Sequence, residues 1–152
     1  MKNVFNGALI AGAVLISVVA PSSAENLGEV HIYKSEYCGC CTDWADALAE
    51  KGYSISVTNT EELTPIKKQA GVSQDLMSCH TATLAGYVLE GHVPLAAIDK
   101  LLKEKPQITG LSVPGMPVGS LGMGEPDATT RYTVYAYGGD LDKPIPFFEV
   151  GN

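Results

Sequence analysis

The sequence predicts an α/β fold in which a central mixed sheet is flanked by helices. Short apolar runs alternate with amphipathic segments through the first half of the chain, and a glycine follows each of the first two amphipathic segments. Sequence rich in glycine and proline begins only after Pro106. Alternation of strand and helix is typical of parallel strands joined by right-handed crossovers.

The first strand is expected over 30–35, and a helix over 42–51 follows it. Residues 54–58 alternate polar and apolar side chains, which predicts a second strand. A second helix is predicted over 61–70. Pro65 is expected in its first turn, because proline lacks the backbone N–H that a helix interior requires.

The middle of the chain is expected to continue with a loop over 77–80 and a single apolar strand over 81–89. Glu90 and Gly91 then form a turn. Pro94 can open a third helix, because proline is favoured at helix starts. The buried stripe of this helix is expected to contain Leu95, Ile98, Leu101 and Leu102.

The last third of the chain differs in composition. Residues 110–126 contain many Gly and Pro residues together with Met116 and Met123, which predicts an ordered loop rather than a regular element. Residues 131–137 and 147–150 are expected to form a C-terminal hairpin at the edge of the sheet.

Residues 1–24 have the pattern of a secretory signal peptide, with Lys2, an apolar run over 8–20 and small residues before a cleavage point after Ala24. The run is shorter than the ~20 residues of a spanning helix. We therefore expect export and cleavage, with residues 25–152 forming one domain that is not inserted in the membrane. A retained N-terminal anchor is the alternative.

The predicted mature chain is strongly acidic. The full chain has 10 Lys and Arg residues against 17 Asp and Glu residues, so loss of Lys2 changes the net charge from −7 to −8. Arg131 is the single arginine. Binding to nucleic acid depends on clustered basic side chains, so the composition argues against that class of function.

The chemistry of this chain is concentrated in its four cysteines. Cys38, Cys40 and Cys41 lie where a strand meets a helix, and the N-terminus of a helix stabilises thiolate over thiol. Cys79 lies about midway along the chain. Structural disulfides usually join distant segments, so this clustering favours redox exchange or metal binding.

The C-x-x-C spacing of Cys38 and Cys41, placed between a strand and a helix, is the geometry of thioredoxin-like proteins. In that fold the loop before the third strand packs against the two thiols and usually carries a cis-proline. Here that loop has Cys79 in the place of the proline, followed by His80. We therefore predict that Cys79 and His80 converge with the three clustered cysteines.

Four converging thiolates exceed the two that a dithiol oxidoreductase needs. Thiolates select Cu(I), Zn(II) or iron–sulfur centres. A structural zinc site uses four ligands around one ion, whereas adjacent Cys40 and Cys41 are expected to splay apart. This favours one or more Cu(I) ions, including a small copper–thiolate cluster. A thiol–disulfide oxidoreductase using Cys38 and Cys41 stays open, as does a structural zinc domain, and enzyme activity is undecided.

Further residues are candidates for the same centre. His80 and Met116 are candidate ligands, and the loop over 113–117 is a candidate lid over the thiols. His92 lies at a hairpin and is expected to face solvent. His31 is expected to be a structural strand residue, and Trp44 and Tyr37 are expected in the core or as a wall that shields the sulfurs.

Several motifs together resemble the CopG-type periplasmic copper-resistance proteins, once described only as a domain of unknown function. The resemblance runs from about residue 30 to residue 123, and its motifs are Tyr33-Lys34-Ser35, Cys38-Gly39-Cys40-Cys41, Ser78-Cys79-His80-Thr81, the segment 86–94 and the segment 110–120. It implies a thioredoxin-like fold, a periplasmic location and copper binding through Cys38, Cys40, Cys41 and Cys79. It also implies copper-export or copper-chaperone proteins as partners and a redox role toward copper. The motifs that carry the resemblance end before Gly124, and the role of the tail after it stays open.

Overall fold

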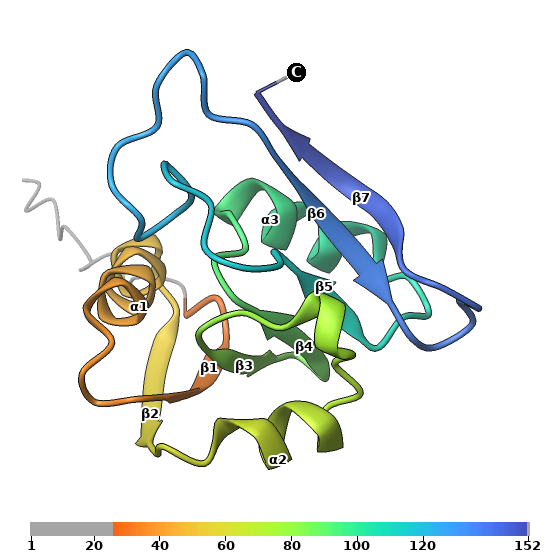
Figure 1. The fold of residues 1–152 in the computed structure, drawn as a ribbon, viewed down its shortest axis with the longest axis horizontal. Helices are drawn as coiled ribbons and strands as arrows, with labels where there is room; N and C mark the ends of the chain where they lie inside the picture. Colours follow the sequence, from red (N-terminus) through yellow and green to blue (C-terminus); the bar gives the residue numbers. More distant parts are fainter. Residues whose placement is uncertain (1–25, 152) are drawn as a thin grey trace, which may run out of the picture.

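The computed structural model describes residues 26–151, so the predicted signal peptide lies outside the described residues (Figure 1). The strands form one seven-stranded sheet in the order β2-β1-β3-β4-β5-β6-β7. The elements are β1 (Glu29–Lys34), α1 (Gly39–Lys51), β2 (Ser54–Asn59), α2 (Leu63–Gln69), the 3-10 helix η1 (Gln74–Leu76), β3 (Thr81–Leu84), β4 (Tyr87–Glu90), α3 (Leu95–Glu104), β5 (Gly110–Ser112), β6 (Tyr132–Tyr137) and β7 (Ile145–Val150).

The first four strands have a thioredoxin-like arrangement. Strands β1 and β2 are parallel and are connected through α1, whereas β3 runs antiparallel to β1 and β4 runs antiparallel to β3. Strand β5 extends this unit in parallel with β4, and β6 and β7 add the predicted C-terminal hairpin. The expected mixed α/β class is confirmed.

The single strand predicted over 81–89 is wrong. The chain reverses at Ala85 and Gly86, whose φ angles are 51° and 87°, and thus makes a hairpin of β3 and β4. Two consecutive positive φ angles are typical of the tight turn that joins twisted antiparallel strands. Alanine is an unusual residue for this conformation, so the apolar run conceals the turn.

Helix α1 begins at Gly39 with Cys38 as its N-cap, three residues before the predicted start at Thr42. Cys40 and Cys41 therefore lie inside its first turn. The second helix also differs at its ends, but Pro65 does lie in its first turn, as predicted. Within the loop expected over 110–126, residues Gly110–Ser112 form the short strand β5.

The hydrophobic core has two parts. Trp44 and Leu48 of α1 and Ile98 of α3 pack in one cluster with Val134 and Ala136 of β6. A smaller cluster near η1 contains Tyr137, with Tyr135 packed against it. Since side chains alternate between the two faces of a strand, these clusters lie on opposite faces of the sheet. No helix in the range 26–151 has the length and apolar character needed to cross a membrane.

Candidate metal centre

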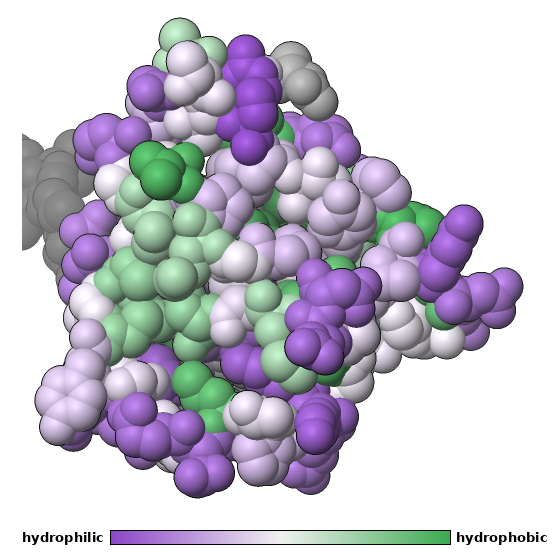
Figure 2. All heavy atoms as spheres, in the orientation of Figure 1, coloured by the Kyte–Doolittle hydropathy of each residue, from purple (hydrophilic) through white to green (hydrophobic). Residues whose placement is uncertain are grey.

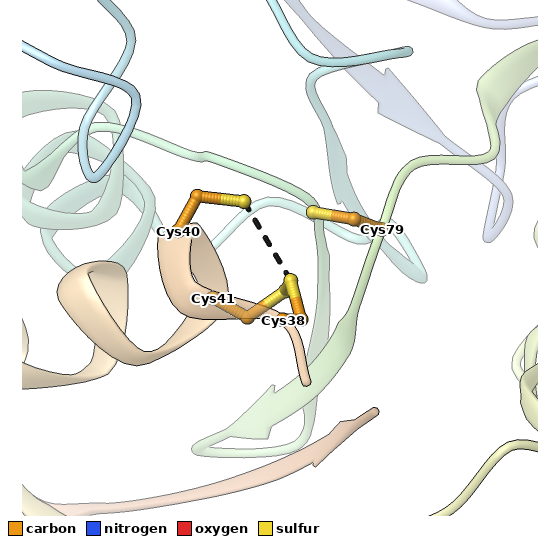
Figure 3. Close-up of side chains that lie close together, drawn as sticks. All are labelled: Cys38, Cys40, Cys41 and Cys79. Carbon is orange, nitrogen blue, oxygen red and sulfur yellow. Dashed lines mark hydrogen bonds between the residues drawn. A yellow bond between two sulfur atoms is a disulfide. The ribbon is translucent and has the colours of Figure 1, made fainter. Parts of the chain in front are cut away.

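The four cysteine sulfurs converge at the start of α1. Cys38 is the N-cap, Cys40 and Cys41 are in the first turn, and Cys79 comes from the loop between η1 and β3 (Figure 3). All four Sγ atoms lie within 4.8 Å of one another. The convergence predicted from the order of the elements is confirmed.

The structure holds the C-x-x-C pair in its oxidised form. Cys38 and Cys41 form a disulfide with their Cα atoms 5.3 Å apart, and Cys40 and Cys79 are free thiols. The Cys40 sulfur lies 3.6 Å from the Cys38 sulfur. A centre with four thiolate ligands therefore requires reduction of the Cys38–Cys41 disulfide.

Two imidazoles adjoin Cys79. Nε2 of His92 lies 3.0 Å from the Cys79 sulfur and Nδ1 of His80 lies 3.4 Å from it. Both histidines are fully buried, so the expectation that His92 faces solvent is wrong. The unrecognised hairpin is the reason: the amide of Gly91 donates to the carbonyl of His80 at 3.0 Å, which brings the next residue beside Cys79.

The orientation of His92 suits a metal ligand. Its Nδ1 lies 2.8 Å from the carbonyl oxygen of Leu121, which can only accept a hydrogen bond, so Nδ1 carries the proton. The lone pair of Nε2 then faces the Cys79 sulfur. Histidine ligands are commonly oriented through such a hydrogen bond from the second ring nitrogen.

Burial controls the protonation of the groups around Cys79. It lowers the pKa of His92, and together with nearby His92 and Lys67 it lowers the pKa of His80 to about 3. Both imidazoles are therefore neutral, which is the form that binds metal. Burial, followed by the neighbouring Cys40, raises the pKa of the Cys79 thiol to about 11. A bound cation favours the thiolate and reverses this preference.

Trp44 lies in the core, which is one of the two positions expected for it, and packs against His80. It is fully buried, its ring centroid lies 4.6 Å from that of His80, and its Nε1 donates to the carbonyl of Val93 at 2.9 Å. Tyr37 differs from the expectation, since 84% of its surface is exposed beside Cys38.

The loop that follows β5 crosses this region. The amide of Gly115 donates to the carbonyl of Met77 at 3.1 Å, and Gly122 packs against the backbone of Cys40 and Trp44. Figure 2 shows a pale, weakly apolar surface beside α1, bordered by hydrophilic residues. Met116 is 54% exposed, and its role as a ligand stays a prediction.

The sequence thus predicted that the four sulfurs and His80 lie together, but it did not predict that His92 lies beside Cys79. The signal that could have found it is the pairing of 81–84 with 87–90. In that register Gly91 lies opposite His80, so His92 comes to lie next to the loop that carries Cys79. His92 was expected to face solvent because the sequence places it at a hairpin, and hairpin connections normally face water.

A thioredoxin-like sheet with four cysteines gathered at a helix start defines a class of protein with a thiol-rich centre that is compatible with metal binding. A family described as "Protein of unknown function, DUF411" matches residues 76–123. The chain belongs to the CopG family of copper resistance proteins, as two solved structures show. "Copper resistance protein copG- Form 1" is 33% identical, with a TM-score of 0.72, covering 82% of this chain and 98% of its own. "Copper resistance protein copG- Form 2" is 34% identical, with a TM-score of 0.73, covering 80% and 97%. No curated protein matches.

Proposed function

We propose that the protein binds Cu(I) through Cys38, Cys40, Cys41 and Cys79 and contributes to copper resistance. The observation that carries this proposal is the approach of all four sulfurs to within 4.8 Å of one another. Soft thiolate ligands select Cu(I), Zn(II) or iron–sulfur centres. Among these metals, the names of the two similar structures support copper.

The number of donors favours a copper cluster over a single zinc ion. His80 and His92 add two nitrogens beside the Cys79 sulfur, so six donor atoms face one region. A structural zinc site uses four. Several Cu(I) ions bridged by thiolates can bind all six donor atoms, whereas one zinc ion would bind four of them. We propose His80 and His92 as ligands, and Met116 as a further thioether ligand from the adjoining loop.

The disulfide between Cys38 and Cys41 couples copper binding to redox state. A disulfide sulfur lacks the charge of a thiolate, so two electrons must reach the pair before the full ligand set exists. We therefore propose that loading depends on a reductant. Electron exchange between these thiols and copper is the form that a redox role would take.

We place the protein in the periplasm, and the support is the signal-peptide pattern of residues 1–24. Its partners would be proteins that deliver or export Cu(I). Thiolates exchange Cu(I) by forming shared intermediates with another soft donor, which suits transfer to a chaperone or an exporter.

Titration of the reduced protein with Cu(I), against a chromophoric Cu(I) chelator, tests this function. We expect binding of at least one Cu(I) per chain and a clear loss of affinity in Cys79→Ser. Ser73→Ala, outside the cysteine cluster, is the control and is expected to bind as the wild type does. Equal binding by Cys79→Ser and the wild type would refute the four-cysteine centre.

The observed Cys38–Cys41 disulfide favours a second candidate, a thiol–disulfide oxidoreductase. Insulin reduction by the metal-free protein separates the two. Efficient turnover that tolerates Cys79→Ser would support the oxidoreductase. Zinc in protein purified without added copper would instead favour a structural zinc domain.

A further inference from the structure

A buried carboxylate lies behind Cys79. Glu90, at the end of β4, is fully buried and forms an ion pair with Lys67 of α2, with Nζ and Oε1 2.6 Å apart. Lys67 is also buried, with 5% of its surface exposed. A buried ion pair adds little net stability over an apolar pair of similar size, so stability alone does not account for it.

The hydrogen bonds of Glu90 bracket Cys79. The backbone amide of Ser78 donates to Oε1 at 2.7 Å, and the hydroxyl of Thr81 donates to Oε2 at 2.7 Å. Lys67 donates to the same hydroxyl at 3.1 Å. Each carboxylate oxygen thus holds one side of the segment that carries Cys79 and His80.

Other hydrogen bonds also hold this loop: the amide of Gly91 donates to the carbonyl of His80 at 3.0 Å, and the hydroxyl of Ser78 donates to the carbonyl of Gly115. Glu90 is the side chain whose bonds reach both flanks of Cys79 and His80, at Ser78 and at Thr81, the first residue of β3. Gly91, the residue after Glu90, also packs closely against this loop. Gly91, at a φ of +72°, leaves room for the Ser78 side chain, where a Cβ atom would collide with it.

We propose that Glu90 and Lys67 are positioning residues for the metal centre, which hold the Cys79 sulfur at the distance from Cys40 that copper binding needs. This inference rests on the proposed copper function. Partners that orient metal ligands typically change affinity by about 10- to 100-fold when they are removed. The same size of effect is expected here, although neither side chain binds the metal.

Two double variants isolate the hydrogen bonds from the charge. Lys67→Met with Glu90→Gln removes both charges and leaves an amide that can still accept from Ser78 and donate to Thr81. Lys67→Met with Glu90→Leu removes the charges and these hydrogen bonds together. Thr81→Val keeps the ion pair but loses the hydroxyl that bonds to both Glu90 and Lys67, and it serves as a third variant if the leucine variant does not fold.

Cu(I) affinity is measured by chelator competition on reduced protein, with circular dichroism to establish folding. We expect the glutamine variant to bind nearly as the wild type does and the leucine variant to bind about 10- to 100-fold more weakly. Thr81→Val should weaken binding in the same direction. In a Cys79→Ser background the leucine change should have no further effect, because it acts through Cys79.

Alkylation of Cys79 by iodoacetamide in the reduced, metal-free protein gives a readout that does not depend on copper. The leucine variant should react several-fold faster at Cys79 and at an unchanged rate at Cys40, because a loosened loop exposes the half-buried Cys79 thiol further. Equal affinity and equal Cys79 alkylation in the folded glutamine and leucine variants would overturn the proposal. If the wild type itself binds no Cu(I), the proposed function fails, and the alkylation rates still decide the positioning role.

Discussion

Nε2 of His92 lies 3.0 Å from the sulfur of Cys79, although the two residues come from different segments of the chain. Because Leu121 holds the opposite ring nitrogen, the Nε2 lone pair is directed at the sulfur. The donor atoms of the candidate metal centre therefore extend from the cysteine cluster to a histidine pair.

The first prediction concerns this histidine. His92→Phe keeps a buried ring but removes the donor, and we expect a loss of Cu(I) affinity of at least about tenfold. His31→Phe is the matched control, since His31 bonds to Ser56 and Thr58 on β2, away from the sulfurs. Chelator competition under reducing conditions measures both. Equal affinities in the two variants would exclude His92 as a ligand.

The second prediction concerns the disulfide. The oxidised protein should show two reactive thiols, those of Cys40 and Cys79, whereas the reduced protein should show all four. We expect the number of Cu(I) ions bound per chain to rise with the number of free thiols. A reductant should restore the binding that oxidation removes. Thiol titration beside metal analysis of the same sample tests this. Full copper capacity in protein with two thiols would contradict the role of Cys38 and Cys41.

The third prediction concerns pH. In folded, metal-free protein the pKa of His80 is lowered to about 3, whereas in the unfolded chain it lies near its ordinary value of 6.5. Between these values the unfolded state binds more protons, so the free energy of unfolding must fall as pH falls below about 6.5. The slope from this one group reaches at most about 1.4 kcal/mol per pH unit.

Urea unfolding of the reduced, metal-free protein at about pH 7 and about pH 5 measures this dependence. His80→Phe should flatten it, because the group that takes up the proton in the unfolded chain is gone. His31→Phe is the control for the general effect of acid on carboxylates. An unchanged pH dependence in His80→Phe would show that His80 is not held neutral by the fold.

The fourth prediction compares two glycines of the loop that follows β5. Gly122 and Gly124 have φ angles of +82° and +86°, so alanine is strained by a similar amount at either position. A Cβ atom on Gly122 would lie 2.6 Å from the carbonyl oxygen of Cys40, whereas one on Gly124 meets nothing within 4 Å. Gly122→Ala should therefore cost about 1–3 kcal/mol more in the free energy of unfolding than Gly124→Ala.

Gly122→Ala should also weaken Cu(I) binding, because the displaced loop carries the carbonyl of Leu121 that orients His92. Thermal unfolding and chelator competition on both variants test the prediction. Equal behaviour of the two variants would mean that the loop does not press on the start of α1.

Much of the centre follows from local sequence. Three cysteines between an apolar run and an amphipathic segment lie at the start of a helix because strand and helix periodicity are local properties. The position of Cys79 can then be inferred from the order of strands and helices, which predicts that its loop faces the same helix start. Copper as the metal follows from the thiolates and from the resemblance.

The parts that were missed depend on pairing across distance. Ala85 gives little local sign of a turn, and without that turn the register that returns Gly91 to His80 cannot be deduced. The burial of His92 and the contact of Glu90 with the loop before β3 both depend on that register. Tyr37 was expected in the core or as a wall that shields the sulfurs, but it precedes the start of α1 and is largely exposed.

Chain order and hydrophobic period are sufficient to predict that four thiols gather at one helix start in a thioredoxin-like sheet. The presence of His80 and His92 beside Cys79, and of the buried Glu90–Lys67 pair behind it, depends on tertiary contacts. Those contacts arise where a hairpin, α2 and a long loop meet, and hydrogen bonds between such segments are specified by three-dimensional packing rather than by any local pattern.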